Sequence, residues 1–467
     1  MKTDTSKKML FVSLTRNRKY LWYLILAIST LLFLSHTYGD ILLTTRHGIN
    51  FWNILFKGQI IHFYSYDLLQ LQAVYSFPVY VVFALWNFPL WILEYFFKID
   101  VMNIVYCLIW SKIMLLIFLL ISTMTMKKIC IELGMKKEVG NWCLLFYMSS
   151  SFIFSSLFVI SQYDIIALSF MLIGVLFYLK GKFSKFIFWF MIAISFKFFA
   201  LLVYIPLVLL FEKRIIRILK YLVEGISFTL LFSLIFMFDS ASKQSGAFML
   251  DAIKLFSNYI LQLSIGNTSL FYLLTIILFI YSYYKETKNI EELRNYCVYL
   301  SFVVFGIFFA CVRTNPYWAI FLTPFTALLI FQNPNRMRIN VILEILMCSS
   351  LIFAQMIVFY WCFGIQTMKA MILPMLFGNS ESFSKIWSTD LITSSYNMNI
   401  FLNQYALPIL VAVFTSCIIA LAWINFPRTE MENNDIDADK NIYFFRILIG
   451  GGICLLPIIG YIVSSFN

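Results

Sequence analysis

The stretch Val101–Met126 reads VMNIVYCLIWSKIMLLIFLLISTMTM and carries a single charged residue, Lys112. A bilayer core of about 30 Å requires about 20 consecutive apolar residues in a helix, so this stretch is long enough to cross a membrane. Lys127 and Lys128 follow it directly, as expected where a helix leaves the membrane on the cytoplasmic side. The stretch therefore predicts a transmembrane helix with a basic cytoplasmic end.

Apolar runs of this kind recur along the whole chain of 467 residues, which is 61% hydrophobic and only 12% charged. A soluble domain has about 25% charged residues, so the composition excludes a soluble globular protein. Since no long polar stretch interrupts the runs, we expect one all-α polytopic membrane domain over residues 1–467. We predict about 13 transmembrane helices, within a range of about 11–14, at Tyr20–Tyr38, Val101–Met126, Asn141–Ile160, Ile165–Leu179, Phe186–Phe196, Phe198–Phe211, Tyr221–Phe238, Ser269–Tyr284, Tyr296–Val312, Tyr317–Gln332, Ile339–Tyr360, Gln404–Ile424 and Tyr443–Ser464.

The net charge of +12 is divided among short basic clusters between the apolar runs. A nucleic-acid-binding protein would gather these residues on one face, so nucleic acid is not an expected partner. Lysine and arginine mark cytoplasmic loops instead, which predicts a cytoplasmic N-terminus, an outer C-terminus and an acidic cytoplasmic loop over residues 425–442. The richness in Ile, Phe, Lys and Asn is typical of an AT-rich bacterial genome, so the membrane is expected to be a bacterial plasma membrane.

The requirement that basic clusters lie on the cytoplasmic side also decides between two interpretations of each of two apolar regions. If residues 73–97 crossed the membrane, the basic cluster at residues 127–137 would fall outside. We therefore expect residues 39–100 to form a first outer loop with juxtamembrane helices, and residues 361–403 to form a late outer loop. Residues 186–211 have basic clusters at both ends, so they should turn back near Lys197 as two short helices.

Several classes of site are not indicated. The nine cysteines lie mostly inside apolar runs without a CxxC or His-spaced pair, so neither a disulfide framework nor a zinc site is expected. No Gly-rich phosphate loop or HExxH motif occurs, which disfavours an ATP-driven pump and a membrane zinc protease.

The head of the first outer loop concentrates polar residues at a membrane boundary. Asp40, Arg46 and His47 lie within eight residues of one another, and all three histidines of the chain occur in residues 36–62. An ionised aspartate at this depth is costly unless it is solvated or paired, so Asp40 is a candidate functional residue. The alternative is that Asp40 only caps a helix that begins near Gly39.

Two further polar groups lie between apolar helices on the predicted outer side. Ser161-Gln162-Tyr163-Asp164 precedes the helix predicted at residues 165–179, where Asp164 can orient a substrate, cap the helix, or do both. Lys197 is a lone cation between two apolar half-helices, and a phosphate or carboxylate partner explains it better than snorkelling alone.

Two more cations complete the candidate set. Arg313 and Tyr317 belong to the stretch Arg313-Thr-Asn-Pro-Tyr317-Trp318, which suits either substrate binding or an interfacial anchor. Lys112 lies within Val101–Met126 and either faces a cavity or snorkels outward.

The segment from Gln162 to Pro206 resembles a known pattern. Gln162-Tyr-Asp164 at a helix start, a helix ending in Leu179-Lys-Gly-Lys, and then Ile194-Ser-Phe-Lys197 followed by Ile205-Pro206 are similar to GT-C glycosyltransferases. Within that superfamily, the segment is similar to bacterial mannosyltransferase-like members and to the PIG-M group. Asp40, just after the first helix, and the segment from Arg313 to Trp318 also match that superfamily. Ser161 stands where the family has glycine, and Asp40 stands where it has an adjacent acidic pair, so a divalent metal is left open.

The resemblance implies transfer of a hexose, with mannose as one option, from a polyprenyl-phosphate donor to a glycan, lipid or protein acceptor at the outer face. In an inverting reaction a carboxylate takes the proton of the acceptor hydroxyl, and we assign this role to Asp40, with Asp164 orienting the acceptor. The expected substrate-binding residues are Lys197, Arg313, Gln162, Tyr163, Arg46, His47, Lys112 and Tyr317.

Two other classes stay open. A lipid-linked glycan flippase or transporter should have charges on several helices around a central cavity, whereas the predicted helices carry few charges. A polysaccharide polymerase or ligase typically has arginines in a large outer loop, whereas residues 361–403 contain lysines and no arginine.

Overall fold

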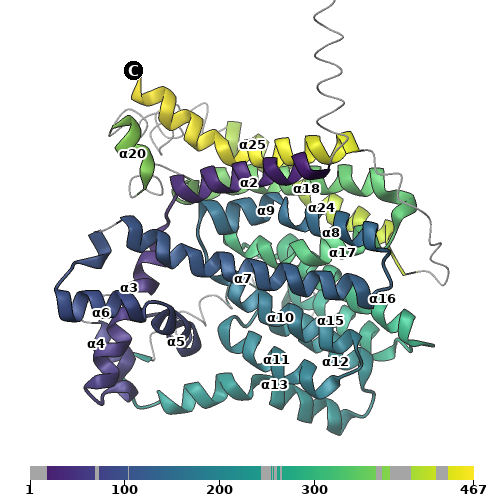
Figure 1. Ribbon diagram of the computed structural model, residues 1–467. Helices are drawn as coiled ribbons and strands as arrows, with labels where there is room; N and C mark the ends of the chain where they lie inside the picture. Colours follow the sequence, from purple (N-terminus) through teal and green to yellow (C-terminus); the bar gives the residue numbers. More distant parts are fainter. Residues whose placement is uncertain are drawn as a thin grey trace, which may run out of the picture. The chain divides into compact units, whose positions relative to one another are not determined.

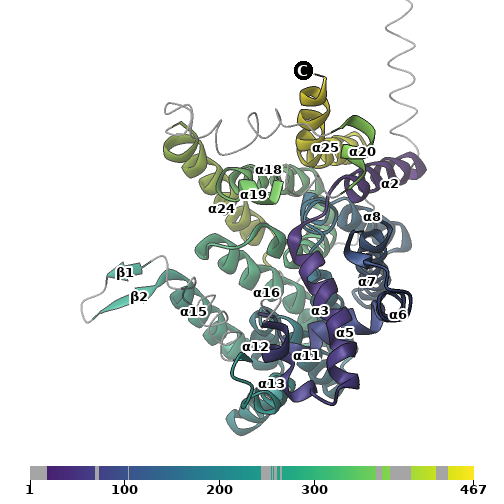
Figure 2. The same cartoon turned by 90° about the vertical axis from the view of Figure 1, so that its left-hand side faces the viewer.

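The computed structural model describes residues 18–68, 73–103, 105–242, 266–363, 371–378, 401–427 and 440–466, together with Lys254, Phe256 and residues 260–262 (Figure 1). The described chain is helical apart from one antiparallel hairpin, in which Ile260 pairs with Ser269 and Gln262 with Asn267 (Figure 2). The all-α prediction is confirmed. The late outer loop and the acidic cytoplasmic loop lie mostly outside the described residues.

The chain divides into two compact units, which are built from alternating segments of sequence. The first unit takes residues 1–37, 134–160 and 315–467, and the second takes residues 38–133 and 161–314. The division into two units does not test the prediction of a single membrane domain over residues 1–467, which stays a prediction.

The first unit is a group of long apolar helices joined by short ones. α25 packs against α2 and α18, and α18 packs against α24. Its elements are α2 (Arg18–Ser35), α8 (Lys137–Met148), α9 (Ser151–Ile153), the π-helix η3 (Phe154–Val159), the 3-10 helix η5 (Pro316–Phe321), α17 (Thr323–Phe331), the 3-10 helix η6 (Pro334–Arg336), α18 (Met337–Val358), α19 (Tyr360–Phe363), α20 (Ile372–Phe377), the π-helix η8 (Phe401–Ala406), α24 (Leu407–Ile424) and α25 (Lys440–Ser465).

The second unit combines a cluster of short helices with a bundle in which α10 lies between α7 and α11 (Figure 1). Its elements are α3 (Gly39–Phe56), the 3-10 helix η1 (Ile60–His62), α4 (Phe63–Leu68), α5 (Phe77–Trp86), α6 (Phe88–Phe97), the 3-10 helix η2 (Val101–Asn103), α7 (Val105–Glu132), α10 (Asp164–Leu179), α11 (Phe183–Phe196), α12 (Ala200–Phe211), α13 (Ile215–Ile235), β1 (Ile260–Gln262), β2 (Asn267–Ser269), α15 (Leu270–Tyr284) and α16 (Ile290–Cys311).

In the described part of the chain, 7 helices are long and apolar enough to cross a membrane, or up to 9 if each bent pair counts as one span. This supports a membrane protein, but the predicted thirteen crossings are not confirmed. The difference comes from apolar helices of fewer than about 18 residues, such as α10 and α15, which fall short of the bilayer thickness when taken singly. The expected first helix is present as α2, which ends at Ser35.

Of the two apolar regions with more than one interpretation, residues 186–211 are broken as expected. α11 ends at Phe196, Lys197 has extended backbone, and α12 begins at Ala200, which confirms two short helices that meet at Lys197. Residues 77–97 form α5 and α6, bent by 65° at Asn87, with a proline in the first turn of each. Proline suits the first turn because a backbone N–H there would have no intrahelical acceptor, so its absence costs no hydrogen bond. The position of α5 and α6 relative to a membrane stays a prediction.

Packing around α3 is unusually close and fixes the cluster of short helices. A Cβ on Gly48 would lie 2.8 Å from the backbone carbon of Phe83, so only glycine allows α3 and α5 to approach in this way. Phe51, Phe63 and Tyr80 are buried in the core that these helices share. This contact sets where the chain on either side of α5 can lie.

Lys213, which is partly buried, joins the ends of two helices in the second unit. The Nζ of Lys213 donates to the carbonyl oxygens of Leu209, Ser282, Tyr283 and Lys285 at 2.6–3.1 Å. These carbonyls belong to the last turns of α12 and α15 or directly follow them, where helical carbonyls have no intrahelical donor. Lys213 therefore caps both helices at once.

Candidate functional site

Asp40 lies in the first turn of α3, directly after Gly39. A negative side chain is favourable there because the helix N-terminus carries partial positive charge. The residue at the N-cap position is Tyr38, whose side chain makes no capping hydrogen bond, and Asp40 lies inside the first turn of the helix. The carboxylate of Asp40 accepts two hydrogen bonds from other segments of the second unit.

The first of these bonds comes from Tyr75, in the loop before α5. Its hydroxyl donates to Oδ2 of Asp40 at 2.9 Å. Burial, and next the negative charge of Asp40, raise the pKa of Tyr75 well above its ordinary value. The phenol therefore keeps its proton near neutral pH and acts as the donor.

The second bond comes from Gln162, whose Nε2 donates to the same Oδ2 atom at 2.5 Å. Gln162 is held by a sharp turn before α10, in which Ser161 has φ +57°. Glycine adopts that left-handed backbone without steric cost, whereas serine is strained there.

Asp164 begins α10 and is almost wholly buried, with 1% of its side chain exposed. Its Oδ1 lies 2.9 Å from Nζ of Lys197, which is 12% exposed. Lys197 is in turn flanked by the rings of Tyr163 and Tyr75, at 5.0 Å and 5.5 Å from their centroids. The cation compensates a carboxylate that would be very costly to bury alone, and the prediction of a carboxylate or phosphate partner for Lys197 is confirmed for the carboxylate.

These residues form one polar cluster inside the second unit, named here the Asp40 cluster: Asp40, Tyr75, Gln162, Tyr163, Asp164 and Lys197. Its two carboxylates and one ammonium give a formal charge of −1. Three buried oxygens of the cluster and the hydroxyl of neighbouring Ser161 have neither a hydrogen bond nor an ion-pair contact among the described residues: Gln162 Oε1, Tyr163 Oη, Asp164 Oδ2 and Ser161 Oγ. Buried polar atoms are almost always paired, so a group of unpaired atoms beside a charged cluster is typical of a ligand site.

Three other predicted site residues lie in the same unit but have their own surroundings. Arg46 forms an ion pair with Glu94 of α6, in which the single nitrogen Nη1 donates to both carboxylate oxygens, at 2.8 and 2.6 Å. His47 is buried and its ring meets Tyr80 edge-on at 5.2 Å. Lys112 is only 1% exposed, so it is buried within the unit and does not snorkel outward.

The segment after α16 does not stay in one unit. Arg313 is an exposed residue of the second unit, two positions past the end of α16. Tyr317 is buried in η5 of the first unit, where Asn315 donates to its hydroxyl at 2.9 Å. A joint role for Arg313 and Tyr317 with the Asp40 cluster stays a prediction.

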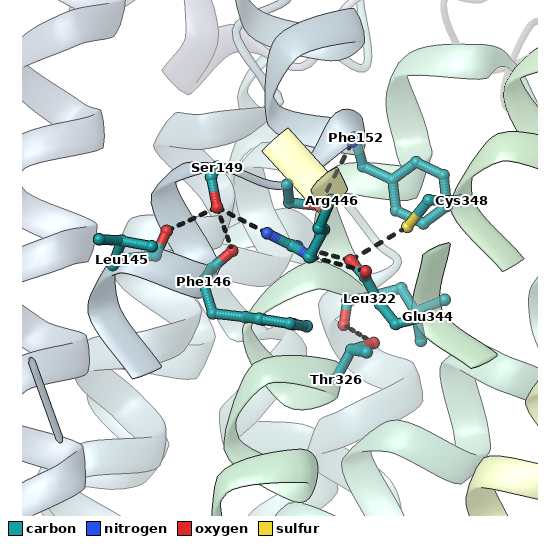
Figure 3. Close-up of polar contacts among 10 residues, drawn as sticks. Leu145, Phe146, Ser149, Phe152, Leu322, Thr326, Glu344, Cys348 and Arg446 are labelled. Carbon is teal, nitrogen blue, oxygen red and sulfur yellow. Dashed lines mark hydrogen bonds and ion pairs between the residues drawn. The ribbon is translucent and has the colours of Figure 1, made fainter. Parts of the chain in front are cut away.

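A second charged centre, with no member among the predicted site residues, lies in the first unit (Figure 3). Arg446 of α25 donates from Nε and Nη2 to the two carboxylate oxygens of Glu344 of α18, at 2.7 and 2.6 Å. Its Nη1 donates to Ser149 at 2.6 Å, and its guanidinium carbon lies 3.5 Å from the centroid of Phe146. Both charged side chains are only 3% exposed. This ion pair and Lys112 are buried charges inside helices that were expected to carry few charges.

Tyr75 and the ion pair were missed for different reasons. Tyr75 stands in an aromatic-rich stretch where nothing in the sequence separates it from Tyr64 or Tyr80. Glu344 and Arg446, by contrast, are single charges within predicted transmembrane helices, and such residues are rare enough to be candidates by default.

Within the described residues, no group of three or more His, Cys, Asp and Glu side chains lies close enough together to hold a metal ion. The carboxylates of Asp40 and Asp164 and the side-chain carbonyl of Gln162 are oxygen atoms of the cluster that could coordinate a metal ion. No family model, curated protein or solved structure matches this chain.

Proposed function

We propose that the protein is an integral membrane glycosyltransferase of the GT-C kind, which moves a hexose from a polyprenyl-phosphate donor to an acceptor at the outer face of the membrane. The observation that carries the proposal is the Asp40 cluster, in which two carboxylates, a lysine and an amide from distant segments meet beside unpaired buried atoms. Three of these residues, Gln162, Asp164 and Lys197, also belong to the segment that resembles the family. Asp164 and Lys197 are in contact at 2.9 Å, and Gln162 bonds Asp40 from the same segment.

The proposed reaction is a single inverting substitution. The acceptor oxygen forms a bond to the anomeric carbon while the bond from that carbon to the phosphate oxygen breaks, and its electron pair leaves with the phosphate. Asp40 takes the acceptor proton, a contribution typically worth about 10²–10⁴-fold in rate. Asp164 orients a hydroxyl of the acceptor or of the sugar.

The leaving group is a phosphate that gains negative charge, so a fixed cation nearby stabilises the transition state. In the proposal Lys197 supplies this charge. An ammonium group has three N–H donors, and one contact with Asp164 leaves two for phosphate oxygens. Arg313, Arg46 and Lys112 are the further cations of the proposal, and Arg46 must then share its charge with Glu94.

The proposed topology has thirteen crossings, a cytoplasmic N-terminus and an outer C-terminus in a bacterial plasma membrane. It places the starts of α3 and α10, and the break at Lys197, at the outer face. The support is the positive-inside pattern of the basic clusters. Short helices such as α10 and α15 would count as crossings in this arrangement, with membrane thinning or tilt of their neighbours accommodating their length.

A lipid-linked glycan transporter is the second candidate, because Lys112, Glu344 and Arg446 are charged side chains buried inside apolar helices. Such residues often mark a transport pathway. Glu344 and Arg446 nevertheless satisfy each other with two short hydrogen bonds, as expected of a structural pair. A polymerase or ligase stays a third class with no observation in its favour.

One experiment separates these functions. The purified protein is reconstituted in liposomes with radiolabelled single-sugar polyprenyl phosphates, and the lipid phosphate and the labelled sugar are quantified. The proposal expects free polyprenyl phosphate to appear in step with sugar attached to an acceptor or to water. Movement of the intact donor across the bilayer would indicate a transporter, and transfer only from a preassembled glycan would indicate a polymerase or ligase. Either result would refute the proposal.

A further inference from the structure

We infer that Tyr75 is a positioning residue, which together with Gln162 saturates one carboxylate oxygen of Asp40 and leaves the other oxygen to receive the acceptor proton. The inference rests on the proposed function and adds a residue and an atom to it. It arises from the geometry alone, because Tyr75 is not distinguished in the sequence.

The two hydrogen bonds to Asp40 are unequally shared between its oxygens. Tyr75 and Gln162 both donate to Oδ2, at 2.9 and 2.5 Å. Among the described residues, nothing donates to Oδ1. A carboxylate oxygen that already accepts two hydrogen bonds is a poor proton acceptor, so Oδ1 is the atom that remains for the chemistry.

The backbone of Tyr75 is held by hydrogen bonds to both its N–H and its carbonyl group. The backbone N–H of Tyr75 donates to the hydroxyl of Tyr80 at 2.9 Å, and the hydroxyl of Tyr64 donates to the backbone carbonyl of Tyr75 at 2.9 Å. Tyr64 and Tyr80 are buried in the core around α3. A loop residue whose two backbone groups are bound by buried side chains has little freedom to move.

The ring of Tyr75 also links the two charged halves of the cluster. It meets the ring of Tyr163 edge-on at 5.1 Å, and Lys197 lies 5.5 Å from its centroid. Its position therefore depends on the same contacts that hold the Asp164–Lys197 pair. Tyr75 fixes the orientation of Asp40 relative to the cation that faces the leaving group.

In the resulting step, the acceptor O–H bond breaks and its proton moves to Oδ1 of Asp40. The acceptor oxygen bonds to the anomeric carbon, and the bond from that carbon to the phosphate breaks with its electrons on phosphate. Oδ2 keeps its two donors throughout. Errors of about 1 Å in such an arrangement can cost about 100-fold in rate, which gives the contact from Tyr75 a measurable effect.

The test compares Tyr75→Phe with a matched control, Tyr66→Phe. Each variant loses one hydroxyl and keeps its ring, but the hydroxyl of Tyr66 accepts from Lys57 and does not contact Asp40. We expect kcat of Tyr75→Phe to fall about 10- to 100-fold, with the donor KM within about twofold of wild type because the donor contacts are untouched. Equal kcat in the two variants would overturn the inference.

A spectroscopic measurement reports the contact without relying on turnover. The carboxylate stretching bands of Asp40 are isolated as the infrared difference between wild type and Asp40→Asn. We expect these bands to move in Tyr75→Phe and to stay in place in Tyr66→Phe. Unmoved bands in Tyr75→Phe would show that Tyr75 does not hold Asp40.

Two safeguards keep the test decisive. If Tyr75→Phe does not fold, Gln162→Leu removes the other donor on Oδ2 and must move the same bands, and a failure to do so overturns the inference. If the wild type transfers no sugar, the proposed function fails, while the infrared comparison still decides whether Tyr75 positions Asp40.

Discussion

Replacing Arg446 with methionine should destabilise the protein strongly, because the change removes the partner of a buried carboxylate. Glu344 is 3% exposed and receives two hydrogen bonds from Arg446, at 2.7 and 2.6 Å. Without them, the hydrogen bond that Glu344 keeps among the described residues comes from the thiol of Cys348 at 3.3 Å, which is a weak donor. Breaking one side of a buried ion pair typically costs about 3–5 kcal/mol.

The other contacts of Arg446 support the upper part of this range. Its Nη1 donates to Ser149 at 2.6 Å, and its guanidinium carbon lies 3.5 Å from the centroid of Phe146. A hydrogen bond from a charged group contributes about 1.5–3 kcal/mol. These contacts are not additive with the ion pair, so we expect the total loss to stay near 4–5 kcal/mol.

The assay is equilibrium unfolding of the purified protein in detergent, with a double-mutant cycle of Arg446→Met and Glu344→Leu. The exposed Arg338, also on α18, provides the control as Arg338→Met. Removing both charges together should cost less than removing either one, because neither is then left unpaired. A loss below about 1 kcal/mol in each single variant, or additive losses in the double variant, would refute the reasoning.

Three further predictions concern single residues of the second unit. Ser161→Gly should raise the free energy of unfolding by about 1 kcal/mol in the same assay, because it relieves the left-handed backbone and removes an unpaired hydroxyl, whereas Ser161→Ala should gain less since it keeps the strained backbone. Lys213→Met should lower the free energy of unfolding by about 1–3 kcal/mol, because helix-end carbonyls lose their donor, and Lys220→Met, on the exposed face of α13, should change it by less than about 0.5 kcal/mol. Lys197→Ala should raise the donor KM by about 10-fold or more in the sugar-transfer assay, and the same rise in Lys98→Ala would show that any outer cation suffices.

The sequence predicted the main break in the second unit because charge and hydropathy agree there. Basic clusters at both ends of residues 186–211 can lie on one side of a membrane only if the chain turns back, and Lys197 is the polar residue in the middle. The structure has the break at that residue. The number of crossings was less predictable, because apolar runs of 12–16 residues such as α10 and α12 satisfy composition without satisfying length.

The candidate site was predictable in its charged members and not in its neutral ones. Asp40, Asp164 and Lys197 stand out since a charge at a membrane boundary needs a reason. Tyr75 has no such signal, because its role depends on a contact with a residue 35 positions away. The strain at Ser161 was also hidden, since serine gives no sign that its backbone is left-handed.

The ion pair of Glu344 and Arg446 shows a different limit. Each residue is the one charge in its predicted transmembrane segment, Ile339–Tyr360 or Tyr443–Ser464, and the two are separated by 102 positions. The sequence marks each as unusual, but only the packing of α18 against α25 reveals that they neutralise each other. Their pairing is a contact between α18 and α25 in which each charge compensates the other.

The central claim is that Asp40 is the base for sugar transfer, and the most direct measurement compares wild type with Asp40→Asn. Both are reconstituted in identical liposomes with a single-sugar polyprenyl phosphate, and the initial rate of transfer is recorded, with the exposed Asp100→Asn as control. We predict that Asp40→Asn loses at least about 10²-fold in rate while Asp100→Asn keeps the wild-type rate. Turnover by Asp40→Asn at the wild-type rate, with the protein folded, would contradict the claim.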